Sequence, residues 1–335
     1  MRYPRICSLC SALLVFAVSA CNEATVVEPT QKYLSGVLDV DMNIYVEYGK
    51  TYHMTPYGVW HPEVSMRLDG TIPDSLSYLY VNPFTKDTVR TKTIGVDSVD
   101  KDPSADLTIT KDSLGTYVVT WYARAEGYYS RSCTKSIIEV SEKSITGFVK
   151  YPEDGELEVS GRKYRTAAVG GKEWMRENLA DPVRGGTPYA ESAAMTDLMG
   201  LYYTWDEAAS ACPPGWKLPS SADWDAVGAD GNVKSVLAPI AFNGNQMWEY
   251  HYAIGEINDN THLSIIPAGY MKISGSKKSF SGLGERAVFW TSDVKPDDSG
   301  MGIAKYFLDD SNNVGECYFP KSEIGAAVRC VFSGQ

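Results

Sequence analysis

The histidines and carboxylates are the side chains of this sequence with most scope for chemistry, and their spacing does not favour catalysis. The four histidines are scattered, at His53, His61, His251 and His262, without the short ligand spacing of a zinc site. The chain has no P-loop, GxSxG or HExxH motif. Carboxylates are abundant, but no spacing singles out the two that a glycosidase needs. We therefore expect no catalytic residues and no enzyme; a carbohydrate-active enzyme is the less favoured alternative.

Aromatic side chains are better candidates for binding. The chain has 22 Tyr and 8 Trp, whose flat faces and hydrogen-bonding edges suit sugar or peptide surfaces. Most of the tryptophans lie in motifs typical of a packed core. Trp248, Tyr250 and Tyr252 lie outside the tightest motifs, so we expect Trp248 to be exposed and all three to be candidate ligand-binding residues.

Two oxygen-rich loops are weak candidates for Ca²⁺. They contain Asp297 with Asp298, and Asp309 with Asp310. Ca²⁺ needs such ligands at several points around one ion, and neither loop has the spacing of an EF-hand. Solvated acidic loops are the favoured interpretation, and no cofactor is expected.

The composition is that of a globular protein with an acidic surface. The 335 residues are 44% hydrophobic and 22% charged, and the formal net charge is -11. This length allows two domains. The acidity argues against nucleic acid as a partner, because a nucleic-acid surface needs clustered Lys and Arg.

The N-terminus is predicted to be a targeting segment. Arg2 and Arg5 precede an apolar run at 13–18 that is too short to span a bilayer. Val18-Ser19-Ala20-Cys21 resembles the bacterial lipobox, which implies that residues 1–20 are removed and Cys21 is lipidated. Residues 21–33 then form a tether to the outer membrane, at its periplasmic or cell-surface face. The alternative is an ordinary signal peptide in which Cys21 is incidental.

Residues 34–142 are predicted to form a two-sheet β-sandwich. Short alternating stretches are broken by turn signals such as Asp69-Gly70, without a helical period. The segment 114–119 resembles the tyrosine corner of immunoglobulin-like domains, in which the Tyr117 hydroxyl would bond to nearby backbone. The region also resembles PKD-like sandwiches of Bacteroidetes surface proteins. Val119 occupies the position at which antibody domains carry a Cys, so the form of the immunoglobulin-like domain that contains a disulfide is excluded.

Four tripeptides in this region share the pattern Asp, then Ser or Thr, then an aliphatic residue. They resemble the O-glycosylation signal of secreted Bacteroidetes proteins, which makes Ser75, Thr88, Ser98 and Ser113 candidate glycosylation sites. The equally weighted alternative is four turns started by Asp and Ser side chains.

Residues 143–156 are predicted to be a linker, and residues 157–335 a second domain of α+β type. Thr204 followed by Glu207 is a capping box that starts one helix. Ser220 followed by Asp223 is an analogous start for a second helix. Several strand-like stretches follow, among them 263–270, 287–292 and 304–308.

The second domain resembles the FISUMP domain, the Fibrobacter succinogenes major paralogous domain. The resemblance rests on "GKEWMRENL", "GLYYTWDEA", "CPPGWKLPSSADW", "IPAGYM", "FWTSD" and "VRCV", in this order and spacing. It implies a C-type-lectin-like fold in a secreted or lipid-anchored protein of Bacteroidetes type. It also places Asp293 near where lectin-like folds bind Ca²⁺, so Asp293 joins the candidate ligand-binding residues.

The resemblance also implies a disulfide between Cys212 and Cys330, whose positions approach each other in that fold. Four cysteines remain after lipidation of Cys21, and a secreted setting favours disulfides. The alternative is that all four are buried thiols. The states of Cys133 and Cys317 stay open.

The resulting hypothesis is a lipid-anchored, non-catalytic surface protein. It would be anchored to the membrane by its N-terminal lipid. Its second domain would recognise a glycan or another surface protein, so that the protein acts in adhesion. A structural component of a surface or pilus assembly is the alternative.

Overall fold

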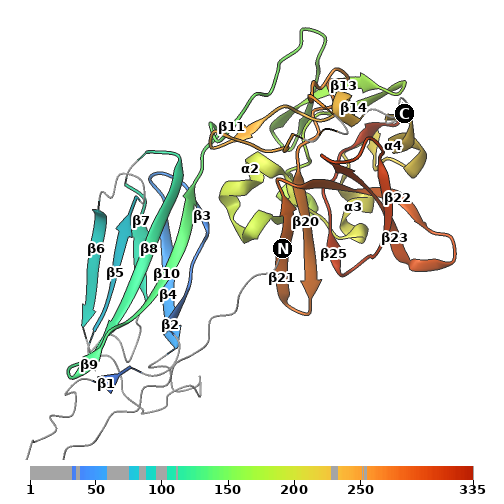
Figure 1. Ribbon diagram of the computed structural model, residues 1–335. Helices are drawn as coiled ribbons and strands as arrows, with labels where there is room; N and C mark the ends of the chain where they lie inside the picture. Colours follow the sequence, from blue (N-terminus) through green and yellow to red (C-terminus); the bar gives the residue numbers. More distant parts are fainter. Residues whose placement is uncertain are drawn as a thin grey trace, which may run out of the picture.

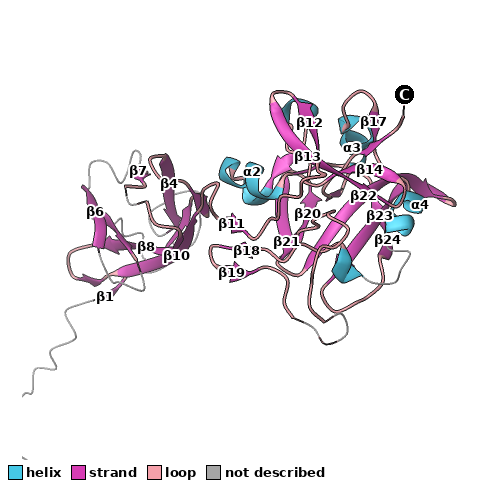
Figure 2. Cartoon of the chain, turned by 90° about the horizontal axis from the view of Figure 1, so that it is seen from above, coloured by secondary structure: helices cyan, strands magenta, loops and turns pink. Residues whose placement is uncertain are grey.

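The computed structural model describes residues 32–34, 38–58, 75–82, 88–95, 104–110, 112–227, 233–250, 252 and 255–334. Strands dominate these residues and the helices are short (Figure 1). The described chain forms two bodies, which can be told apart in both Figure 1 and Figure 2. The predicted fold class, mainly β followed by α+β, is confirmed. No helix among the described residues is long and apolar enough to span a membrane.

The first body consists of two main sheets. The larger has the order β3-β10-β8-β5-β6 and the smaller the order β2-β4-β7. A short parallel pair joins β1 to β9. The strands are β1 (Lys32–Tyr33), β2 (Leu38–Asp41), β3 (Tyr45–Val46), β4 (Thr51–Gly58), β5 (Ser75–Val81), β6 (Thr88–Gly95), β7 (Ala105–Thr108), β8 (Gly115–Arg124), β9 (Tyr128–Tyr129) and β10 (Arg131–Glu139).

Buried side chains alternate with less buried ones along the strands, and the buried side chains form the core between these sheets. In β8, Tyr117, Val119 and Trp121 are buried while the residues between them are not, because successive side chains of a strand point to opposite faces. The Tyr117 hydroxyl donates to the Ser113 carbonyl at 2.8 Å. The predicted tyrosine-corner hydrogen bond is therefore confirmed, while the immunoglobulin-like or PKD-like assignment stays a prediction.

The second body is built around two larger sheets. One has the order β12-β13-β14-β26-β17, and the other has the order β21-β20-β22-β23-β24 with β25 paired to β20. The strands are β11 (Ile145–Thr146), β12 (Gly155–Val159), β13 (Arg162–Val169), β14 (Lys172–Met175), β15 (Thr187–Pro188), β16 (Leu201–Tyr202), β17 (Trp216–Lys217), β18 (Ala241–Phe242), β19 (Asn245–Gln246), β20 (Ala268–Ser274), β21 (Lys277–Leu283), β22 (Arg286–Lys295), β23 (Asp298–Leu308), β24 (Gly315–Pro320), β25 (Ile324–Gly325) and β26 (Val331–Phe332).

Two helices of this body, α3 and α4, begin where side chains cap them. Thr204 and Glu207 form the predicted capping box at α3, and Ser220 exchanges hydrogen bonds with Asp223 at α4. Both predicted helix starts are confirmed. The helices are α2 (Thr196–Met199), α3 (Trp205–Ala211) and α4 (Ser221–Val227), with 3-10 turns η1 (Pro182–Arg184), η2 (Tyr189–Glu191), η3 (Ala193–Met195) and η4 (Val233–Ser235).

The two bodies pack directly against each other. Tyr45 of β3 contacts Tyr189 and Phe242 of the second body, with ring centroids 5.8 and 6.4 Å apart. The Ser192 hydroxyl donates to the Tyr45 carbonyl at 2.9 Å. Tyr45 and Val140 are buried in the same apolar cluster as residues of the second body. This apolar contact fixes the sandwich against the second body.

Candidate functional site

The sheet that contains β22 and β23 has apolar side chains on both faces. On one face, Phe289 and Phe307 pack on Trp224 of α4, with ring centroids 4.7 and 5.7 Å away. On the other face, Trp290 is buried and donates to the Tyr203 carbonyl. The second face is only partly covered, and its uncovered part forms the candidate site.

A cavity of about 380 Å³ lies over that uncovered part, and we call it the aromatic groove. The register of the strands brings its residues together, because Val288 pairs with Tyr306 and Ala304 pairs with Cys317. Its lining residues are Tyr270, Glu285, Arg286, Val288, Tyr306, Leu308, Asp309, Asp310, Cys317 and Phe319.

Three half-buried aromatic rings form the floor and sides of the groove. The rings of Tyr270 and Phe319 lie 6.1 Å apart and within 14° of parallel. Tyr306 lies over Gly315 of the neighbouring strand, where a Cβ atom would come within 2.1 Å of the ring. Gly315 therefore makes room for a tyrosine ring flat against the sheet.

Charged groups surround these rings. Arg286 lies 3.4 Å from Glu285, and Asp309 accepts a hydrogen bond from the backbone N–H of Glu249 at 3.2 Å. Partial burial raises the pKa of Asp309, and the charge of Asp310 adds to the rise. The groove thus combines apolar ring faces with hydrogen-bond acceptors and one guanidinium.

Cys317 lies in the groove as a thiol without a disulfide partner. Burial raises the pKa of Cys317 to about 11, and its Sγ donates to the Ala304 carbonyl at 3.6 Å. The thiol is protonated at neutral pH, and the thiolate is the nucleophilic form of cysteine. Cys317 is therefore an inert part of the wall.

The structure brings some of the predicted site residues to this groove. Asp309 and Asp310 line it. Tyr250 and Tyr252 are 72% and 83% exposed, in the segment that Glu249 connects to Asp309. Asp309 and Asp310 are therefore the predicted site residues that line the groove, while Tyr250 and Tyr252 are exposed but are not among its lining residues.

The prediction that Trp248 is an exposed aromatic is wrong. Trp248 is fully buried in the core, and its Nε1 donates to the Ile265 carbonyl at 3.0 Å. It packs among residues such as Leu263 and Phe289. Its ring anchors the segment from inside, so that the tyrosines that follow it are the residues that reach solvent.

The side chain of Asp293 caps the start of helix α4. Its Oδ2 accepts a hydrogen bond from the Ser221 backbone N–H at 2.7 Å, at the first residue of α4. Carboxylates at a helix start satisfy backbone N–H groups that have no partner within the helix. The structure assigns Asp293 to capping, away from the aromatic groove.

The two acidic pairs considered for Ca²⁺ lie at opposite ends of β23. Asp297 and Asp298 are at its start, and Asp309 and Asp310 follow its end. Ten residues of strand, 299–308, lie between Asp298 and Asp309, which puts these two residues about 35 Å apart along the strand, so the pairs do not ligate one ion together. Within the described ranges, no three His, Cys, Asp or Glu side chains are grouped as a metal site.

The structure contains the disulfide between Cys212 and Cys330. Cys212 is the C-cap residue of α3, and Cys330 is a buried residue that precedes β26. The bond therefore ties a helix end to the last strand. Cys133 is a half-buried thiol in the first body.

The modification candidates stay predictions. Ser75 and Thr88 begin β5 and β6, while Ser113 is half-buried and its carbonyl accepts the Tyr117 hydrogen bond. Ser98, the targeting segment 1–20 and Cys21 lie outside the described residues.

Sequence reasoning missed Tyr270, Arg286, Tyr306 and Phe319. These residues come from four strands, and only the register of the sheet brings them together. One local signal was present, because Ala304, Tyr306 and Leu308 alternate with Ile303, Lys305 and Phe307. This pattern indicates a strand with apolar side chains on both faces.

Comparison with known protein families gives a match over the second body. The model of the family described as Fibrobacter succinogenes major domain matches residues 168–331, whereas no curated protein matches the chain. The matched range contains both capped helices, the disulfide and the whole aromatic groove. Residues 168–331 of this chain therefore form a domain of the Fibrobacter succinogenes major domain family.

Proposed function

We propose that this protein is a surface-anchored, non-catalytic recognition protein that binds a glycan in the aromatic groove. The family match supports a surface protein. The observation that carries the glycan assignment is the groove itself, where the rings of Tyr270, Tyr306 and Phe319 lie among carboxylates and one guanidinium.

The chemistry of a sugar ring fits this arrangement. A pyranose has an apolar C–H face, which packs on aromatic rings, and a rim of hydroxyl groups, which donate to carboxylates. Asp309 and Asp310 supply acceptors, and Arg286 supplies donors. Because Glu285 adds a third carboxylate against this single guanidinium, the groove favours a neutral glycan over an anionic one.

A second hollow extends the groove towards the junction of the two bodies. It has a volume of about 420 Å³ and shares Glu285 with the groove. Tyr45 and Ile138 of the sandwich line it, together with the exposed amides Asn245 and Gln246. The two adjoining hollows support the proposal that the ligand is an oligosaccharide. The direct packing of the two bodies supports the proposal that the sandwich is a stalk that presents the second body.

The proposal places the protein at the outer membrane through a lipid on Cys21. The tether that follows Cys21 would lead into the sandwich, so that the second body faces outwards. Burial raises the pKa of the Cys317 thiol to about 11, which disfavours nucleophilic chemistry by this residue.

A glycan array tests the proposal. The purified chain from Asn22 onward is labelled and applied to neutral and anionic oligosaccharides of increasing length. We expect binding to neutral glycans, with longer chains preferred over monosaccharides. Blank arrays, or binding governed only by anionic glycans, would refute the assignment.

A further inference from the structure

The segment that joins the two bodies is held along its length by the second body. Its strand β11 pairs with β18, and the Ser144 carbonyl accepts from the Asn243 backbone N–H at 2.7 Å. Gly147 comes so close to the second body that a Cβ atom at this position would lie 2.6 Å from the Pro239 carbonyl oxygen. The chain therefore leaves the sandwich through a segment that cannot stretch before these contacts break.

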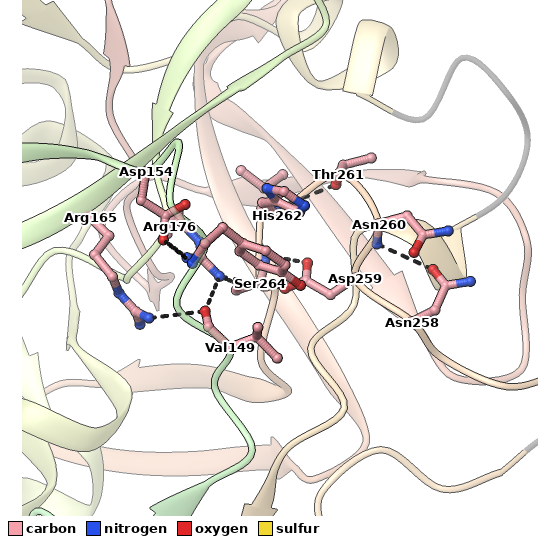
Figure 3. Close-up of polar contacts among 12 residues, drawn as sticks. Val149, Asp154, Arg165, Arg176, Asn258, Asp259, Asn260, Thr261, His262 and Ser264 are labelled. Atoms are coloured by element: carbon pink, nitrogen blue, oxygen red, sulfur yellow. Dashed lines mark hydrogen bonds and ion pairs between the residues drawn. The ribbon is translucent and has the colours of Figure 1, made fainter.

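Two arginines fix the next part of this segment (Figure 3). The Val149 carbonyl accepts from Arg165 at 3.3 Å and from Arg176 at 3.1 Å. Arg176 is fully buried and also pairs with Asp154, whose side chain is only 8% exposed. Separation of a buried ion pair leaves an uncompensated charge and is strongly unfavourable. A pull on the second body is therefore passed to the end of β10 without slack.

The two strands at one edge of the larger sandwich sheet, β3 and β10, run parallel. The Ile138 N–H of β10 donates to the Ile44 carbonyl at 2.8 Å. The Val140 N–H donates to the Val46 carbonyl, also at 2.8 Å. Because the strands are parallel, a pull on the start of β3 and an opposite pull on the end of β10 load both hydrogen bonds at once.

The second body holds both of these strands. The buried Ser192 hydroxyl donates to the Tyr45 carbonyl of β3 at 2.9 Å, and the Tyr189 ring packs against the Tyr45 ring with centroids 5.8 Å apart. The Asn243 side chain donates through Nδ2 to the Glu139 carbonyl of β10 at 2.9 Å. Separation of β3 from β10 therefore also has to break the contacts between β3 and the second body.

The chain enters and leaves the sandwich at opposite ends. The pair of β1 and β9 lies at one end, and the second body lies at the other end, next to β3 (Figure 1). A load between the start of the sandwich and the second body therefore acts along the length of β3 and β10.

We propose that the sandwich is a load-bearing unit and that the second body reinforces it through Ser192 and Tyr189. This role rests on the proposed function, in which the N-terminal side is held at the membrane and the second body holds the ligand. Contacts that must break together resist a pull better than contacts that break one after another. The reinforcement therefore keeps the sandwich folded while the bound ligand is under tension.

Constant-force optical tweezers test the proposal on the chain from Asn22 onward, with handles at its two ends and the disulfide intact. Unfolding of the sandwich, roughly 105 residues, should lengthen the chain by about 350 Å. The disulfide withholds the loop between Cys212 and Cys330, whose sequence separation is 118. Unfolding of the second body should therefore lengthen the chain by only about 250 Å, so the two steps differ in length.

Ser192→Ala should raise the rate of the sandwich step about fivefold at a fixed force, which is the factor for loss of one hydrogen bond. The matched control, Ser210→Ala, removes an exposed hydroxyl that donates to the Glu207 carbonyl within the second body. This control should leave the sandwich rate unchanged. Tyr189→Ala removes a ring from Tyr45 and should raise the sandwich rate about tenfold. Steps of unchanged length would show that both bodies of each variant fold.

Three results would overturn the proposal. They are equal sandwich rates for Ser192→Ala and Ser210→Ala, a faster second-body step with an unchanged sandwich step, and separation of the two bodies at a lower force before the sandwich unfolds. No glycan enters this measurement, so blank glycan arrays would refute the proposed function without changing these rates. Equal rates would likewise leave the proposed glycan site untouched.

Discussion

Loss of the Cys212–Cys330 disulfide should greatly destabilise the second body. The bond closes a loop with a sequence separation of 118 residues. In the loop-entropy model, a closure of this length restricts the unfolded chain by about 5 kcal/mol. For a body of this size, each kcal/mol corresponds to roughly 2–4 °C. Cys212→Ala should therefore lower the melting temperature by about 10–20 °C.

Guanidinium unfolding followed by tryptophan fluorescence measures this loss. Six of the 8 Trp lie after residue 156, so the signal reports mainly on the second body. The matched control is Cys317→Ala, which removes a half-buried thiol from the same body without breaking a bond. We expect this control to lose about 1 kcal/mol.

Equal loss of stability in the two variants would contradict this prediction. An unchanged midpoint of unfolding after a reductant has freed both thiols of the disulfide would contradict it as well. Either result would mean that the folded contacts around α3 and β26 hold the chain as well without the bond, and that the loop-entropy model does not describe this protein.

Three further predictions concern single side chains. Trp248→Ala should cost about 3–5 kcal/mol in chemical denaturation because the ring is fully buried; a loss below about 1 kcal/mol would indicate an exposed ring after all. Thr204→Ala removes the capping box of α3 and should cost about 1 kcal/mol, and a neutral substitution would show that the cap is redundant. The hydrogen bond from Lys305 lowers the pKa of Glu316 below its ordinary 4.5. The resulting stability is present above pH 4.5 and is lost as the pH falls through the lowered pKa, so Glu316→Gln should make unfolding less pH-dependent in this acidic window. Unchanged pH dependence in this variant would contradict the assignment.

Local motifs predicted the structure well where neighbouring residues alone decide it. The capping boxes at Thr204 and Ser220 rest on side chains three residues apart, which meet in any helix. Tyr117 likewise bonds to a carbonyl four residues away. The prediction of the Cys212–Cys330 disulfide had another basis, because it rested on the family resemblance and not on the spacing of the cysteines.

The features that the sequence alone did not predict depend on tertiary packing. The segment around Trp248 has alternating aromatic and polar residues, so its sequence does not tell which ring points inwards. The aromatic groove depends on the register of β22, β23 and β24, and on Gly315 making space for Tyr306. The buried carboxylate of Asp154 depends on Arg176, which lies on another part of the chain.

The most direct test of glycan recognition compares two tyrosines on neighbouring strands. Tyr306 lines the aromatic groove, whereas Tyr318 is 45% exposed and lies outside it. Titration calorimetry with the best neutral oligosaccharide from the array should show at least about tenfold weaker binding for Tyr306→Ala. Tyr318→Ala should bind as the unmodified protein does, with both variants showing intact thermal unfolding. Equal affinities for the two variants would contradict the proposal that the aromatic groove is the glycan site.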